Sequence, residues 1–115
     1  MAYNEELADK IREALAELGL ADVEEKKMFR GICFMVNGKM CVCASADEML
    51  CRIGPEYKEA LELNGVRGMI RNGKALKDFV FVSQDAMKTK KEFDSWINKA
   101  LAFNKFAKAT KQVEM

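Results

Sequence analysis

The sequence predicts an α+β protein in which a five-stranded, largely antiparallel sheet is packed by helices in two layers. Two Asn-Gly pairs lie between apolar segments, and amphipathic stretches with helical spacing lie near both ends of the chain. The predicted order is helix, three strands, helix, two strands, helix. With 115 residues, we expect a single domain, with a core from about residue 3 to residue 106 and a frayed tail over residues 107–115.

The first helix is predicted over residues 5–18, because apolar residues recur there with helical spacing. Asn4 is a suitable N-cap before it, and Gly19 is a common residue at a helix C-terminus. Two strands, EEKKMFRGICFMV and KMCVCA, then flank Asn37-Gly38, the pair typical of a two-residue hairpin with a type I′ turn. SADE is predicted to be a turn before the third strand, MLCRI.

Gly54-Pro55 ends the third strand, and proline favours the first turn of a helix, so PEYKEALEL is predicted to be helical. A second hairpin joins VRGMIR to KALKDFVFV through Asn72-Gly73. The final segment, KKEFDSWINKALAFNKFAK, carries an apolar stripe and is predicted to be a long helix. The residues to which we assign structural turns are Gly31, Asn37, Gly38, Asn72 and Gly73.

The four cysteines are predicted to be divided between the two faces of the sheet. With Asn37-Gly38 as the loop, Cys41 and Cys43 share one face, whereas Cys33 and Cys51 share the other. Thiols on opposite faces cannot converge on one metal ion, and neither same-face pair is placed to form a disulfide. We therefore expect structural free thiols in the sheet core and no metal site. A thiol-based redox or metal sensor is the less favoured alternative.

Composition excludes several classes of protein. The chain has a net charge of +1 and no histidine, which removes Ser-His and Cys-His nucleophilic pairs. Its carboxylates form no spaced acid/base pair, and its glycines match no phosphate-binding loop. We therefore expect no enzymatic activity and no cofactor. The N-terminus lacks the pattern of a signal peptide and no apolar run approaches the ~20 residues that span a bilayer, so we expect a cytoplasmic protein without a membrane partner.

The segments KKMFRGICFMVNGKMCVCA, MLCRIGPE, NGKALKDFVFV and WINKALAF occur in this order. With them the chain resembles the N-terminal domain of the TfoX/Sxy family of bacterial competence regulators, from about Tyr3 to Phe106. The resemblance implies an α-β3-α-β2-α two-layer fold. In those regulators a second, helical domain follows, and the two domains act with the cyclic-AMP receptor protein to promote transcription of DNA-uptake genes. Because this chain ends at Met115, we expect it to lack that domain and not to carry over the regulatory role whole.

One position departs from the family pattern. Two glycines usually follow Met-Phe, whereas here Arg30 occupies the first position and only Gly31 remains. If the missing glycine normally allows a bulge or a close approach of another chain, arginine would fill or charge that surface.

We interpret the chain as a non-enzymatic protein-interaction module in transcriptional regulation that contacts its partner through the first hairpin. The alternative is weak nucleic-acid binding through the basic residues of this hairpin. Such lysines more commonly protect a solvated sheet edge from aggregation than bind nucleic-acid bases. Exposed sheet edges are also compatible with a homodimer. The candidate partner-contact residues are Lys26, Lys27, Met28, Phe29, Arg30 and Lys39.

Overall fold

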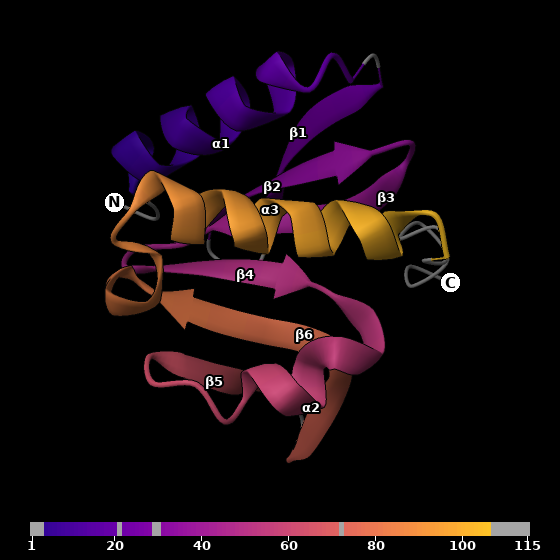
Figure 1. The fold of residues 1–115 in the computed structure, drawn as a ribbon. Coiled ribbons are helices and arrows are strands. Elements are labelled where there is room, and N and C mark those ends of the chain that lie inside the picture. Colours follow the sequence, from indigo (N-terminus) through magenta and orange to yellow (C-terminus); the bar gives the residue numbers. More distant parts are fainter. Residues whose placement is uncertain (1–3, 21, 29–30, 72, 107–115) are drawn as a thin grey trace.

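The structure is a computed structural model that describes residues 4–20, 22–28, 31–71 and 73–106; the predicted tail over residues 107–115 lies outside them. In these residues three helices accompany a six-stranded antiparallel sheet (Figure 1). The elements in chain order are α1 (Glu5–Glu17), β1 (Val23–Met28), β2 (Gly31–Val36), β3 (Lys39–Ala44), β4 (Glu48–Arg52), η1 (Gly54–Glu56), α2 (Tyr57–Ala60), β5 (Val66–Arg71), β6 (Lys74–Ser83), η2 (Gln84–Met87) and α3 (Lys90–Asn104).

The prediction of five strands was wrong, because the segment predicted as the first strand contains two. β1 and β2 are antiparallel neighbours, with Met28 opposite Gly31. The charged half of the segment forms an outer strand, whereas the apolar half forms a strand whose residues are all buried. Side chains alternate between the two faces in β1 as well as in β2, so the sequence pattern, which has no Asn-Gly pair here, did not distinguish two paired strands from one long strand.

The strands lie in the order β1-β2-β3-β4-β6-β5, and every neighbouring pair is antiparallel. β1 and β5 are therefore the outer strands of the sheet that the described residues form. Figure 1 shows α1 and α3 crossing the same side of the sheet, here called the helix face, with α1 at the β1 end. None of the helices in the described ranges is long and apolar enough to cross a membrane.

The main core lies between the helix face and the helices α1 and α3. The predicted N-cap of α1 is confirmed, because the side chain of Asn4 accepts a hydrogen bond from the backbone of Leu7 at 3.1 Å. The large buried side chains of this core include Leu7, Ile11 and Leu15 of α1, Phe34 and Val42 of the sheet, and Phe93, Trp96 and Ile97 of α3. Large apolar side chains contribute about 1.5–3 kcal/mol each to stability when they are fully buried.

A second apolar cluster lies on the other side of the sheet, here called the opposite face. β2 and β3 contribute to both clusters, which explains why they are buried almost throughout. Leu76, Phe79 and Phe81 are partly buried and pack against this cluster. Its buried members are Cys33, Met35, Met40, Cys43, Leu50 and Met69.

The predicted turn at Asn37-Gly38 is confirmed. Asn37 has φ 56° and Gly38 has φ 78°, and positive φ at both central residues is what a type I′ turn requires. In the second hairpin Gly73 has φ 78°, while Asn72 lies outside the described residues. Gly31 is the first residue of β2 and lies opposite Met28, and a Cβ there would collide with the carbonyl oxygen of Ala44.

Candidate interaction surface

A β-bulge in β3 changes the predicted distribution of the cysteines. The register runs from Met35 opposite Met40 to Phe34 opposite Val42, which leaves Cys41 as an extra residue. Cys41 and Val42 both belong to the main core, and the following residue, Cys43, faces the opposite face. Such a bulge places two residues of one strand against one residue of its partner. The prediction assumed a regular ladder and therefore assigned Cys41 and Cys43 to the same face.

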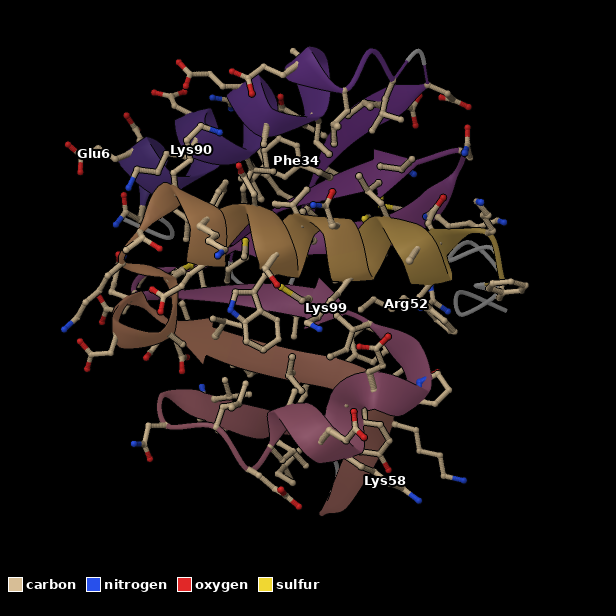
Figure 2. All side chains as sticks on the ribbon, in the orientation of Figure 1. Glu6, Phe34, Arg52, Lys58, Lys90 and Lys99 are labelled. Atoms are coloured by element: carbon tan, nitrogen blue, oxygen red, sulfur yellow. A yellow bond between two sulfur atoms is a disulfide. The ribbon has the colours of Figure 1, made fainter. Side chains whose placement is uncertain are left out.

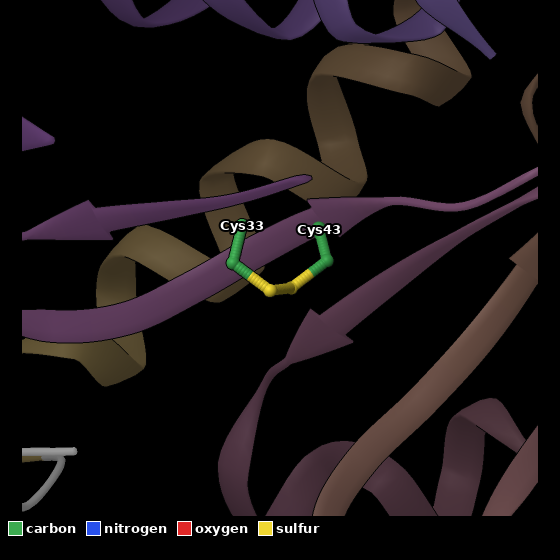
Figure 3. The surroundings of a disulfide bond; sticks show 2 residues. All are labelled: Cys33 and Cys43. Atoms are coloured by element: carbon green, nitrogen blue, oxygen red, sulfur yellow. A yellow bond between two sulfur atoms is a disulfide. The ribbon is translucent and has the colours of Figure 1, made fainter. Parts of the chain in front are cut away.

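Cys33 and Cys43 are consequently direct neighbours on β2 and β3 and form a disulfide bond (Figure 3). The expectation that all four thiols are free was wrong. Cys41 and Cys51 are free and buried together on the helix face, and burial raises the pKa of Cys41 to about 12 and that of Cys51 well above its ordinary value. A high pKa keeps both thiols protonated and poor nucleophiles at neutral pH. No cluster of candidate metal ligands occurs among the described residues.

The outer strand β1 carries four consecutive charged side chains, all exposed: Glu24, Glu25, Lys26 and Lys27. We call these four residues the β1 edge. Because side chains alternate along a strand, Glu25 and Lys27 share the helix face with Val23, whereas Glu24 and Lys26 lie on the opposite face. The β1 edge therefore presents one glutamate and one lysine on each face of the sheet.

Arg12 of α1 holds Glu25 through two hydrogen bonds. Its Nε donates to Oε2 at 2.7 Å and its Nη2 donates to Oε1 at 2.9 Å, the two-bond geometry that strengthens an arginine–carboxylate pair. These hydrogen bonds lower the pKa of Glu25, and they raise the pKa of Arg12. Glu25 therefore has a cationic partner in its own chain, which Asp9 shares, whereas Glu24 forms no ion pair with another of the described residues.

A surface hollow of about 210 Å³ lies between α1 and β1. Arg12 and Glu25 line it together with apolar side chains, among them Leu15, Val23 and Phe34. Figure 2 shows Phe34 on the side of the sheet covered by the helices. The β1 edge thus borders a small apolar depression on the helix face.

The structure brings together only part of the predicted contact set. Lys26 and Lys27 lie on the β1 edge, and Met28 ends β1, but its side chain is outside the described residues, as are Phe29 and Arg30. Lys39 lies two strands away, opposite Val36 in the β2–β3 register. Its Nζ donates to the carbonyl oxygen of Asn104 at 3.2 Å. Lys39 therefore belongs to the contact between the first Asn-Gly turn and the end of α3.

Sequence reasoning missed Asn104, a buried polar residue at the end of α3. Its Nδ2 donates to the carbonyl oxygen of Val36 in β2 at 3.2 Å, and its own carbonyl oxygen accepts the hydrogen bond from Lys39 in β3. Asn104 therefore contacts both strands next to the turn. Sequence reasoning also missed Arg12, because nothing in the helical pattern of α1 indicates which strand carries the carboxylate that this arginine binds.

Two of the three lysines of α3 have acidic partners. Lys90 donates to Asp94 at 2.8 Å, and Lys99 donates to Glu56 at 3.3 Å. Both lysines are labelled in Figure 2, where Lys90 lies beside α1. They form ordinary exposed ion pairs, which contribute little to stability.

On β4, β5 and β6, arginines lie over aromatic rings. Arg67 is 4.3 Å from the ring centroid of Phe81 and also donates to Glu48 at 2.7 Å and 2.9 Å. Arg52 lies 5.6 Å from the ring centroid of Phe79. Because Arg67 is held by both a ring and a carboxylate, these contacts stabilise the β5 side of the sheet.

These features define a class, a small α+β domain whose helices α1 and α3 lie over one face of a six-stranded antiparallel sheet. The family model of the TfoX N-terminal domain matches residues 13–104, most of the chain. The chain therefore belongs to the TfoX N-terminal domain family, which makes it a competence-related domain at the level of the family. Comparisons with curated proteins and with solved structures gave no match.

Proposed function

We propose that this chain is a non-enzymatic protein-interaction module in transcriptional regulation and that the β1 edge is the surface it presents to a protein partner. Membership of the TfoX N-terminal domain family supports the regulatory context. The observation that carries the choice of surface is an outer strand whose four consecutive charged side chains are exposed. An exposed strand can bind another strand through its backbone while its side chains select the partner.

The hydrogen-bond pattern indicates which backbone groups of β1 are available to a partner. The backbone N–H of Asn37 donates to the carbonyl oxygen of Asp22 at 2.9 Å, and these two residues continue the β1–β2 register. In an antiparallel ladder hydrogen-bonded pairs alternate, so every second residue after Asp22 bonds to β2. The N–H and C=O groups of Val23, Glu25 and Lys27 therefore point away from β2.

The charges of the β1 edge favour a protein partner over nucleic acid. Glu24 and Glu25 neighbour Lys26 and Lys27, and Lys39 lies at the other side of β2 beside α3. A phosphate backbone needs several cations along one track, and acidic residues between them weaken that attraction. A partner strand with its own mixed charges matches this edge.

The test is an affinity capture from extract of the source cells with the whole chain. Lys26→Glu/Lys27→Glu is compared with wild type and with Lys58→Glu/Lys91→Glu, which changes the same charge at exposed lysines of α2 and α3. We expect a protein partner, either a transcription-regulatory protein or another copy of the chain, in the wild-type and control captures and its loss from the β1-edge variant. Equal recovery by all three chains, or recovery of nucleic acid alone, would contradict the proposal.

A further inference from the structure

We infer that the partner of the β1 edge is a second copy of this chain, paired β1 against antiparallel β1 about a two-fold axis perpendicular to the sheet. This inference rests on the proposed function, because it assigns the occupant of the same surface. The observation behind it is the order of charges, Glu-Glu-Lys-Lys, along an outer strand. Because this order reverses to Lys-Lys-Glu-Glu, an antiparallel pair of β1 strands can place a glutamate of each copy opposite a lysine of the other.

Symmetry restricts the registers that such a pair can adopt. In an antiparallel pair, residues directly opposite each other share a face of the sheet, so an axis through β1 must pass beside a residue and not between two. Two central registers remain for the β1 edge. One places the axis beside Glu25, and the other places it beside Lys26.

The register centred on Glu25 places Glu24 opposite Lys26 of the second copy, and symmetry repeats this pair. These residues have their backbone groups directed to β2, so they would form a non-hydrogen-bonded pair, in which side chains approach most closely. The two Glu25 side chains meet at the axis, but each already accepts two hydrogen bonds from its own Arg12, which also pairs with Asp9.

The register centred on Lys26 is less favourable. It also gives two glutamate–lysine pairs, now between Glu25 and Lys27, but it places the two Lys26 side chains directly opposite each other. Like charges directly opposite in a sheet are destabilising. Because no ion pair to Lys26 is present in the described chain, the register centred on Glu25 is the one we assign.

The other outer strand does not have this property. The charged residue of β5 whose side chain is described is Arg67, so β5 offers no glutamate that could pair with it in a second copy. Arg67 is in addition occupied by Glu48. Ile70 of β5 is 63% exposed, which makes it a suitable site for a control substitution at an edge that the inference does not use.

An axis perpendicular to the sheet keeps the helices of both copies on the same face. Each copy would add its six strands to one continuous antiparallel sheet. In the assigned register Lys27 of the second copy lies opposite Val23, which lines the hollow between α1 and β1. The methylene groups of that lysine can cover this apolar lining while its ammonium group stays in water.

The experiment measures self-association of the whole chain by sedimentation equilibrium. Glu24→Lys and Lys26→Glu are each expected to weaken the dimer roughly tenfold or more, because either change turns two attractive cross-strand pairs into two repulsive ones. An equimolar mixture of the two variants restores association. In the mixed dimer the introduced lysine of one chain faces the introduced glutamate of the other, and the unchanged Lys26 faces the unchanged Glu24. Ile70→Lys is the control and leaves the dimer unchanged.

Recovery in the mixture also shows that both variants are folded, because unfolded chains would not complement each other. A wild-type chain that stays monomeric, or variants that dimerise as wild type does, would overturn the self-pairing. A monomeric chain that nevertheless captures a different protein through Lys26 and Lys27 would overturn the self-pairing and leave the proposed function standing. If the chain dimerises and the variants weaken and restore the dimer as expected, but the dimer captures no other protein, the result would support the self-pairing and contradict the role in transcription.

Discussion

Cys33 of β2 and Cys43 of β3 lie directly opposite each other, 4.0 Å apart between Cα atoms, and are joined by a disulfide bond. The hydrogen-bond alternation that starts at Asp22 directs the backbone groups of Cys33 to β1, so it faces Cys43 as a non-hydrogen-bonded pair, the closer of the two kinds. The bond closes the hairpin around Asn37-Gly38 on the opposite face of the sheet.

Reduction of this disulfide should lower stability. The two cysteines are 10 residues apart, and the chain-entropy relation gives about 2–3 kcal/mol for a loop of this size. We expect urea unfolding of the wild-type chain to shift to lower denaturant on addition of a reductant. Cys33→Ala/Cys43→Ala should unfold at one midpoint with and without reductant. A wild-type midpoint that is insensitive to reductant would contradict the bond.

The buried thiols of Cys41 and Cys51 should make stability fall at alkaline pH. Burial raises the pKa of Cys41 from 9.0 to about 12 and that of Cys51 in the same direction. Above pH 9.0 the unfolded chain loses thiol protons while the folded chain keeps them. The free energy of unfolding is therefore unaffected below that pH and decreases above it, by up to about 1.4 kcal/mol per pH unit for each thiol.

Urea unfolding between neutral and alkaline pH checks this in Cys33→Ala/Cys43→Ala, a background without thiol–disulfide exchange. Additional replacement of Cys41 and Cys51 by alanine should flatten the alkaline decrease. Parallel pH profiles for the two chains would show that these thiols do not titrate differently on folding.

Asn104→Ala should destabilise the contact between α3 and the first hairpin. Asn104 is 4% exposed, and its Nδ2 donates to Val36 at 3.2 Å. Removing the donor leaves a buried carbonyl oxygen without that bond, at a cost of about 1–3 kcal/mol. Asn98→Ala, at an exposed position of the same helix, should change stability by no more than about 0.5 kcal/mol. Equal unfolding midpoints for the two variants would contradict this role for Asn104.

Gly31→Ala should be strongly destabilising. The new Cβ would collide with the carbonyl oxygen of Ala44 on β3, and this backbone atom cannot move without disturbing the β2–β3 ladder. We expect a loss of more than about 2 kcal/mol. At Gly68 of β5 the nearest atom to a new Cβ is Cδ2 of Leu61 at 3.6 Å, so Gly68→Ala should be nearly neutral. Thermal unfolding of both variants gives the comparison, and a Gly31→Ala chain as stable as wild type would refute the collision.

The candidate surface could be predicted only in part. Charged residues beside an apolar strand indicated an edge, and Lys26 and Lys27 do lie on one. Lys39 was assigned to the same surface because it is close to them in the hairpin sequence, but α3 packs beside that turn and Asn104 accepts its hydrogen bond. Contacts between residues 65 positions apart in the chain depend on helix packing, which periodicity does not contain.

The sequence by itself determined the local structure. Helical spacing and an Asn4 cap define α1, and the backbone freedom of Asn37-Gly38 defines the first turn, because these depend on neighbours along the chain. Only the tertiary structure decided the bulge at Cys41, the division of the predicted first strand into β1 and β2, and the bond between Cys33 and Cys43. A bulge shifts every later residue of its strand by one position, so which side chains meet depends on packing across the sheet and between its faces.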